Sequence, residues 1–344
     1  MRKKVGLMGG SFDPVHMGHI GMAKAALKQL PIEEVWFIPT KSTPLKNHRL
    51  TDEKYRWGML KKAAASDSRF KVSPVELKRS GTSYTIDTLT QLKKDFPEID
   101  FYWLLGADQT AQFDQWKDAD KLMELARFAA VSRDGKAPET GRYDFEVIEM
   151  EPVPVSSTEI RKGHKLNYLP DGVLDYILDN ELYVREWVAD KVSPHRYYHS
   201  CSVAKLSRDL AKAHGLDEHR AWLMGMFHDI AKDLPKAQLR KWVEAVNPEG
   251  LNDHHAIWHG YAGAEIADRI YGLKDDAAKN AIFNHVKGTS YDVYAMILFI
   301  ADKLDPLRGY DSSGMIKACM HDLYNGFMLV HMENKKYLEK GKNK

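Results

Sequence analysis

Strand-like and helix-like segments alternate through the first half of the chain, and this alternation disappears in the second half. In the first half, short apolar runs such as Val35–Ile38 and Phe101–Leu105 end in proline or glycine and are separated by helical patterns. This order is typical of a mostly parallel sheet with helices on both faces. From about Tyr183 onward, long helical patterns dominate and strand-like runs are missing. We therefore predict an α/β domain over residues 1–186 and an all-α domain over residues 187–344.

The composition excludes several classes of protein. The 344 residues carry a formal net charge of +2, so no overall field would attract nucleic acid or a membrane surface. The two cysteines, Cys201 and Cys319, are too few for a disulfide framework and fit a reducing compartment. The most apolar stretch, Tyr294–Ala301, is too short to span a bilayer. We expect a cytoplasmic protein with small-molecule substrates and no nucleic-acid or membrane partner; the sequence leaves a homo-oligomer open.

A glycine-rich segment follows the first strand-like run and precedes the first helical pattern. It reads Gly-Gly-Ser-Phe-Asp-Pro-Val-His-Met-Gly-His from Gly9 to His19. Glycines let backbone amides approach a phosphate closely, and the start of the following helix favours negative charge at the same place. His16 and His19 can donate N–H groups to phosphate oxygens as charge shifts during transfer. Because no Gly-Lys-Ser/Thr follows, the segment predicts a phosphate site that is not a Walker A loop.

The same segment resembles the His-x-Gly-His signature of the nucleotidyltransferase superfamily, and a second signature lies at Ser156–Arg161. The resemblance implies a Rossmann-like nucleotidyltransferase fold in which the second segment opens a helix and holds the phosphates of ATP. It also implies Mg²⁺ bound with the ATP, and His16 and His19 as catalytic residues. The ATP-binding residues implied in this way are Gly9, Gly10, Ser11, Phe12, His16, His19, Ser156, Ser157, Thr158 and Arg161.

Three further segments are similar to the nicotinate-mononucleotide adenylyltransferases, namely Gly81–Leu89, Gly106–Asp108 and Trp116. In that family a Ser-Tyr-Thr segment and a tryptophan recognise the nicotinate ring and its carboxylate, a task suited to an aromatic face and to hydroxyl or amide donors. The residues implied to bind nicotinate mononucleotide are Lys46, Tyr84, Thr85, Asp108 and Trp116. The chain departs from the family at Leu45, where a histidine is usual, which leaves the phosphate contacts of that loop open.

One alternative for the first half is a phosphopantetheine adenylyltransferase. Such an enzyme shares the glycine-rich motif. It is not expected to carry the Ser-Tyr-Thr-Ile-Asp-Thr-Leu string or the tryptophan at this place, so the first assignment is favoured.

Histidines and aspartates recur at wide intervals in the second half. The ordered set is His199, His228, Asp229, His259, His285 and Asp302. Imidazole and carboxylate ligands suit iron, manganese, zinc and similar divalent metals, and ligands from several helices fit a site inside a helical bundle. The other histidines of this half are expected to be solvated or packed: His195, His214, His219, His254, His255, His321 and His331.

This set resembles that of the HD-domain phosphohydrolases. The strings His228–Pro235, His259–Ala264 and Ala301–Arg308 resemble the branch that splits diadenosine tetraphosphate symmetrically into two ADP. The resemblance implies a divalent metal, iron in that branch with manganese or another metal as alternatives, and a catalytic role for Asp229. The implied metal ligands are His199, His228, Asp229 and Asp302, and the implied polyphosphate-binding residues are Lys232, His259, His285 and Arg308.

Two departures from that branch concern substrate preference. Asp305 stands where the branch usually has glutamate, and Val286-Lys287-Gly288 stands where it tends to show Thr-Thr-Gly. The alternatives for this half are hydrolysis of another nucleotide, such as a signalling alarmone, and a sensor that binds nucleotides without turnover. For the whole chain we predict a bifunctional enzyme: adenylyl transfer from ATP to nicotinate mononucleotide, and hydrolysis of diadenosine tetraphosphate.

Overall fold

The chain folds as two compact units. The computed structural model describes residues 2–41, 50–132 and 141–342, and its internal contacts divide the chain into Met1–Asn180 and Glu181–Lys344. The boundary expected from the sequence, between 186 and 187, falls inside helix α8 (Val184–Lys191), whereas the contacts divide the chain before that helix.

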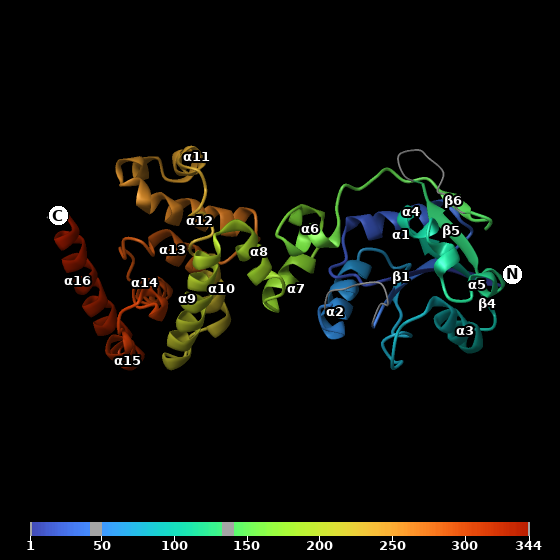
Figure 1. Ribbon diagram of the computed structural model, residues 1–344, viewed down its shortest axis with the longest axis horizontal. Helices are drawn as coiled ribbons and strands as arrows, with labels where there is room; N and C mark the ends of the chain where they lie inside the picture. Colours follow the sequence, from blue (N-terminus) through green and yellow to red (C-terminus); the bar gives the residue numbers. More distant parts are fainter. Residues whose placement is uncertain (1, 42–49, 133–140, 343–344) are drawn as a thin grey trace. The chain divides into compact units, whose positions relative to one another are not determined.

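The first unit is built around a sheet of six parallel strands (Figure 1). The strands are β1 (Lys3–Gly10), β2 (Glu34–Pro39), β3 (Phe70–Val72), β4 (Ile99–Leu105), β5 (Arg127–Val131) and β6 (Glu146–Ile148). Their order across the sheet is β3-β2-β1-β4-β5-β6, so β1 pairs with β2 on one side and with β4 on the other. The order reverses between β1 and β4, and ligands of such sheets bind beyond the carboxyl ends of the strands at this point.

The helices of this unit connect the strands and cover the sheet. They are α1 (Met17–Gln29), α2 (Glu53–Ala64), α3 (Thr85–Asp95), α4 (Ala107–Thr110), α5 (Ala119–Leu125), α6 (Ser157–Arg161) and α7 (Val173–Asp179), with short 3-10 helices at Phe113–Gln115 and Leu166–Tyr168. Val5 and Leu7 of β1 have no exposed surface, as expected for a parallel strand between covered faces. Trp103 of β4 and Phe128 of β5 share one core cluster with Phe113 of the first 3-10 helix.

The second unit is entirely helical within the residues that the structure describes. Its helices are α8, α9 (Pro194–Ala213), α10 (Glu218–Phe227), α11 (Lys236–Val246), α12 (Trp258–Arg269), α13 (Asp276–Asn284), α14 (Val293–Lys303), α15 (Ser313–His321) and α16 (Leu323–Lys342). Three 3-10 helices lie at Pro248–Asn252, His255–Ile257 and Pro306–Arg308. Helix α14 is buried from Tyr294 to Asp302 and packs against α9, α10, α13 and α16, which makes it the central helix of the unit.

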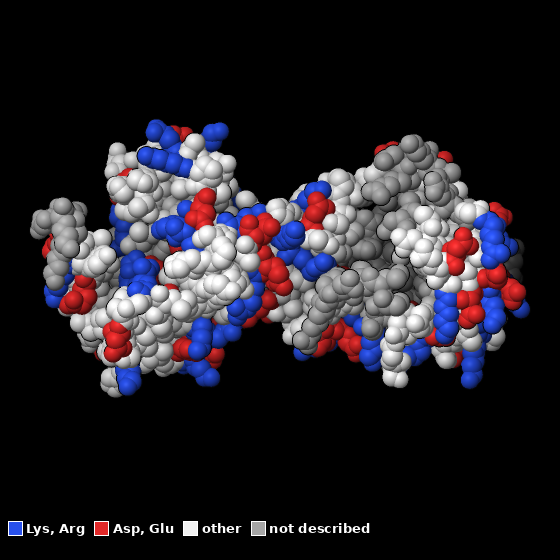
Figure 2. Space-filling model, viewed as in Figure 1, with Lys and Arg blue, Asp and Glu red and all other residues white. Residues whose placement is uncertain are grey.

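The predicted fold class is therefore confirmed: a parallel α/β unit is followed by an all-α unit. Within residues 2–41, 50–132 and 141–342, no helix combines the length and the hydropathy that a bilayer crossing requires. Figure 2 shows basic and acidic side chains interspersed over the visible face of each unit, without one dominant sign. Binding of phosphate by this chain must then depend on local sites.

Candidate functional site

The glycine-rich segment lies at the carboxyl end of β1, and a buried arginine holds its backbone. The guanidinium of Arg56, on α2, donates from Nη1 to the carbonyl of Ser11 at 2.9 Å and from Nε to the carbonyl of Thr51 at 2.8 Å. Arg56 is 1% exposed, so these contacts are shielded from water. Phe12 adopts a positive φ of 46°, and its buried ring anchors the glycine-rich segment in the core.

The two histidines of the signature lie together at the start of α1. Their ring centroids are 3.9 Å apart, and the backbone N–H of His16 donates to Nδ1 of His19 at 3.2 Å. Because Nδ1 of His19 accepts, its proton is assigned to Nε2, where it can be donated to a phosphate. Burial lowers the pKa of His16 to about 4, against the opposing influence of Glu159. His16 is therefore neutral at pH 7.

The second phosphate signature meets the first one directly. Ser157 donates from its hydroxyl to the carbonyl of Pro14 at 2.9 Å, and Nη1 of Arg161 donates to the carbonyl of Asp13 at 2.5 Å. These contacts join residues separated by 143 and 148 positions in the sequence. Ser156 caps α6 and forms a capping box with Glu159, in which each side chain accepts from the backbone N–H of the other residue. The box fixes the start of the helix beside the glycine-rich segment.

A cavity of about 580 Å³ opens beyond the ends of β1 and β4. It brings together residues from the glycine-rich segment, from α6 and from the segments similar to those that recognise nicotinate. The predicted site residues that line it are Gly9, Gly10, Ser11, His19, Tyr84, Thr85, Trp116 and Ser157. Thr158 and Arg161 do not line it; they contact each other on α6, where Nη2 of Arg161 donates to the hydroxyl of Thr158 at 3.2 Å. Lys46 lies outside the described residues, and Asp108 belongs to α4.

The cavity also contains residues that the sequence analysis did not single out. Glu76 lines it and is 4% exposed; burial raises the pKa of its carboxyl although Thr88 donates a hydrogen bond to it at 2.8 Å. Lys117 follows Trp116, and its Nζ lies 4.8 Å from the ring centroid of Tyr84. The resemblance to nicotinate-mononucleotide adenylyltransferases identified Trp116 in the sequence. No local pattern distinguishes Lys117 from an ordinary exposed lysine.

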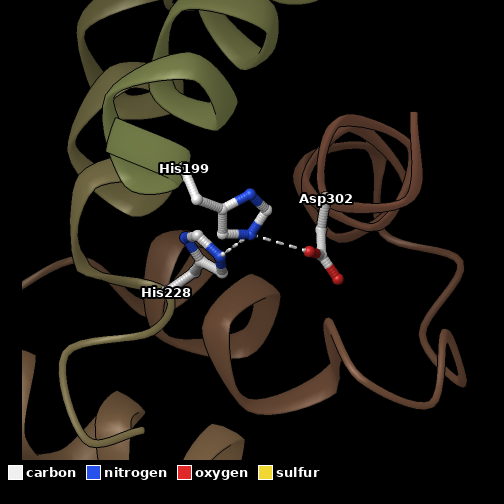
Figure 3. A group of neighbouring side chains, drawn as sticks. All are labelled: His199, His228 and Asp302. Atoms are coloured by element: carbon white, nitrogen blue, oxygen red, sulfur yellow. Dashed lines mark hydrogen bonds and ion pairs between the residues drawn. The ribbon is translucent and has the colours of Figure 1, made fainter. Parts of the chain in front are cut away.

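In the second unit, three ligand candidates converge from α9, the end of α10 and α14 (Figure 3). Nε2 of His199 lies 3.2 Å from Oδ1 of Asp302 and 3.3 Å from Nε2 of His228. His228 is fully buried, and its Nδ1 hydrogen-bonds to the carbonyl of Gly225 at 2.7 Å, which directs Nε2 toward the other two. A Cβ at Gly225 would lie 2.5 Å from the Cα of Ala204, so glycine is needed for this approach of α10 to α9.

Asp229 lies at the centre of a second, overlapping group with His228 and His285. Its Oδ1 lies 3.1 Å from Nε2 of His259 and 3.7 Å from Nε2 of His285. Burial works against ionisation of this carboxyl, but the neighbouring His228 and His259 hold the pKa of Asp229 well below its usual range. The structure thus gathers all six histidine and aspartate residues of the predicted set around one point.

Cations surround this group and line a cavity of about 540 Å³. Nζ of Lys232 lies 3.0 Å from Nε2 of His259, and Arg308 donates to Oδ1 of Asp302 at 2.5 Å. Two more cations were not predicted. The guanidinium of Arg196 donates to Asp233 at 2.6 Å, and the ammonium of Lys303 contacts Asp302 at 2.7 Å. Exposed His195 also lines the cavity.

The donor set fits a divalent metal. Imidazole nitrogen and carboxylate oxygen are the available ligands, and burial lowers the pKa of His228 to about 4, so its ring is neutral. Burial opposes protonation of His199, but hydrogen bonds to Asp302 and Asp305 outweigh this and raise its pKa to about 9. A proton on His199 then balances part of the negative charge of the buried carboxylates. A bound metal cation would balance the same charge in place of this proton.

Comparison with known proteins assigns a different family model to each of the two units. Residues 7–163 match the family model described as cytidylyltransferase-like, and residues 196–307 match the HD domain model. A protein of Mycoplasma pneumoniae named probable nicotinate-nucleotide adenylyltransferase/Ap4A hydrolase is 30% identical over 337 residues, which cover 94% of this chain and 97% of its own. A probable nicotinate-nucleotide adenylyltransferase of Clavibacter michiganensis subsp. michiganensis is 39% identical over 190 residues, covering 53% of this chain and 94% of its own.

A solved structure also resembles the first unit. It is the Plasmodium falciparum nicotinic acid mononucleotide adenylyltransferase complexed with NaAD, with a TM-score of 0.46 and 23% identity. The similarity covers 53% of this chain and 97% of that chain.

Proposed function

The chain belongs to the family of the nicotinate-nucleotide adenylyltransferase/Ap4A hydrolases, and we propose that it catalyses both reactions that this double name states. The first unit would transfer the adenylyl group of ATP to nicotinate mononucleotide. The second unit would hydrolyse diadenosine tetraphosphate (Ap4A) to two ADP.

The proposal for the first unit depends on one observation: a single cavity contains both the phosphate-binding segments and the Tyr84, Thr85 and Trp116 group. In the reaction, a phosphate oxygen of nicotinate mononucleotide attacks the α-phosphorus of ATP. The bond from that phosphorus to the bridging oxygen breaks, and pyrophosphate leaves. Such a transfer needs positioning and charge stabilisation more than covalent catalysis.

The residues of the first unit can supply both. His16, which is neutral, and His19 would donate N–H groups to oxygens on which negative charge increases, and Mg²⁺ bound with ATP would neutralise the pyrophosphate. The indole of Trp116, partly buried against Phe113, offers a flat face for the nicotinate ring. The amides at the start of α3, next to Tyr84, are suited to a carboxylate.

The proposal for the second unit depends on the convergence of its ligand set inside a cation-lined cavity. A divalent ion held by His199, His228, Asp229 and Asp302, with iron as the first candidate and manganese as the second, would lower the pKa of a bound water toward neutrality. Asp229 would accept a proton from the attacking water. Lys232 and Arg308 would stabilise the negative charge of the departing ADP, with His259 and His285 beside them.

Purified full-length protein tests both halves of the proposal. Incubation with ATP, nicotinate mononucleotide and Mg²⁺ should yield the dinucleotide and pyrophosphate in equal amounts, with 4'-phosphopantetheine as the competing substrate that should not react. Incubation with diadenosine tetraphosphate and Mn²⁺ or Fe²⁺ should yield ADP as the single nucleotide product. Formation of ATP and AMP, or tight binding without turnover, would contradict the hydrolase assignment.

A further inference from the structure

A buried carboxylate beside the metal-ligand candidates has no part in the chemistry described above. Asp305 has no exposed surface and caps the 3-10 helix Pro306–Arg308. It meets His199 and Ser202, which are three residues apart and so lie on one face of α9. The carboxylate therefore links a metal-ligand candidate to the short helix that carries Arg308.

Each oxygen of this carboxylate has its own hydrogen-bond donors. Oδ2 accepts from Nδ1 of His199 at 2.6 Å. Oδ1 accepts from the hydroxyl of Ser202 at 2.5 Å and from the backbone N–H of Leu307 at 3.1 Å. The other ring nitrogen of His199, Nε2, faces His228 and Asp302. The histidine is therefore held at one nitrogen and directed at the ligand group with the other.

We propose that Asp305, held in place by Ser202, is a positioning residue that keeps a proton of His199 on Nδ1, so that Nε2 is the nitrogen that gives up its proton and offers its lone pair when a divalent metal ion binds. A carboxylate on the far nitrogen of a metal-ligating histidine fixes the ring and raises its basicity. The inference rests on the proposed hydrolase function and adds to it the residue that orients one ligand. It also assigns to metal binding a position at which sequence comparison had suggested only a change in substrate preference.

The hydrogen bonds predict what a nearly isosteric substitution would do. In Asp305→Asn, the amide oxygen must face Ser202 and Leu307, because both of them donate. The amide NH₂ then faces Nδ1 of His199 and donates to it. The ring must accept at Nδ1 and carry its proton on Nε2, and a protonated Nε2 cannot bind a metal.

Binding of Mn²⁺ to the full-length chain tests the proposal without any substrate. The free ion is followed by its electron paramagnetic resonance signal during titration. Asp305→Asn should weaken Mn²⁺ binding about 10- to 100-fold, the usual effect of losing such a partner. Asp305→Glu should restore most of the affinity, because it returns an acceptor to Nδ1. Ser202→Ala removes one hydroxyl hydrogen bond to the Asp305 carboxylate, leaves the contact with His199 in place, and should weaken binding about 2- to 10-fold.

Two controls separate positioning from folding. Asp311→Asn changes an exposed aspartate that accepts a hydrogen bond from the backbone N–H of Ser313, at the start of α15, and it should leave Mn²⁺ affinity unchanged. Adenylyl transfer and the circular dichroism spectrum should be those of the wild-type chain in every variant. If Asp305→Asn does not fold like the wild-type chain, Ser202→Ala provides the test instead, because Ser202 is partly exposed. An unchanged Mn²⁺ affinity in Ser202→Ala then overturns the proposal.

The result that would overturn the proposal directly is Asp305→Asn binding Mn²⁺ as tightly as the wild-type chain. Failure of the wild-type chain to bind Mn²⁺ would overturn it as well. Weakened binding in Asp305→Asn supports it even if the wild-type chain binds Mn²⁺ but does not cleave diadenosine tetraphosphate. The Mn²⁺ titration tests the positioning role, and the cleavage assay tests the proposed substrate. A wrong substrate and a wrong positioning role therefore give different results.

Discussion

Oδ1 of Asp302 lies 3.2 Å from Nε2 of His199, although 103 residues separate them in the chain. The contact exists because α14, buried along most of its length, packs against α9. The ligand group is thus assembled by the packing of helices and not by a local loop. Substitution of a single ligand should therefore remove metal binding while most of the packing that holds the helices persists.

Removal of His228 should abolish metal binding in the second unit. Its ring is fully buried and directed by the Gly225 carbonyl, so Nε2 of His228 has a fixed place in the ligand group. His228→Ala should weaken the affinity for Mn²⁺ by more than about 100-fold, beyond the effect of losing an outer partner. Metal analysis of the purified protein checks this. His321→Ala, an exposed histidine at the end of α15, is the matched control and should keep the wild-type metal content.

Removal of Trp116 should affect one substrate of the first unit selectively. The indole lines the same cavity as Tyr84, whereas the hydrogen bonds that hold the phosphate-binding segments come from Arg56, Ser157 and Arg161. Trp116→Ala should raise KM for nicotinate mononucleotide about tenfold, the value of one lost aromatic stack. KM for ATP should change little. Steady-state kinetics with each substrate varied in turn measure both, and Trp57→Ala on α2 is the control. An equal rise in both KM values would contradict ring recognition by Trp116.

The first unit should lose stability in mild acid because of His16. Burial lowers the pKa of this ring to about 4, from its ordinary value of 6.5. The folded pKa is the lower one, so the contribution of neutral His16 is present above pH 6.5 and is lost as the pH falls toward 4. The loss should amount to on the order of 2 kcal/mol for this ring.

Chemical denaturation of the wild-type chain and of His16→Gln, at pH 7 and at pH 5, isolates this contribution. The variant should lose less stability between the two pH values than the wild-type chain does. Identical losses would show that His16 titrates normally in the folded state.

The order of elements could be predicted from the sequence, because each depends on local patterns. Val35–Ile38 predicted a buried strand from four consecutive apolar residues before a proline, and β2 occupies Glu34–Pro39. The change to long helical patterns near Tyr183 likewise predicted the all-α unit. Both signals come from the local hydrophobic pattern, which can be read without knowing the tertiary contacts.

The supporting residues of the sites could not be predicted in this way. Arg56 looks like one of many helix arginines, and its burial arises only where α2 packs beside the Ser11 carbonyl. Asp305 looked like a change near the substrate, but its partner His199 is 106 residues away. Arg196 and Lys303 belong to the second cavity by the same kind of packing. Their roles depend on distances across the fold, about which a single sequence carries little information.

The central claim is that one chain carries two independent active sites. It is tested most directly by assaying His16→Ala and His228→Ala for both reactions, with products separated by chromatography. His16→Ala should lower adenylyl transfer about 100-fold or more through loss of a phosphate donor. It should leave ADP formation from diadenosine tetraphosphate at the wild-type rate. His228→Ala should abolish ADP formation and leave adenylyl transfer intact. Loss of both reactions in either correctly folded variant would contradict the account.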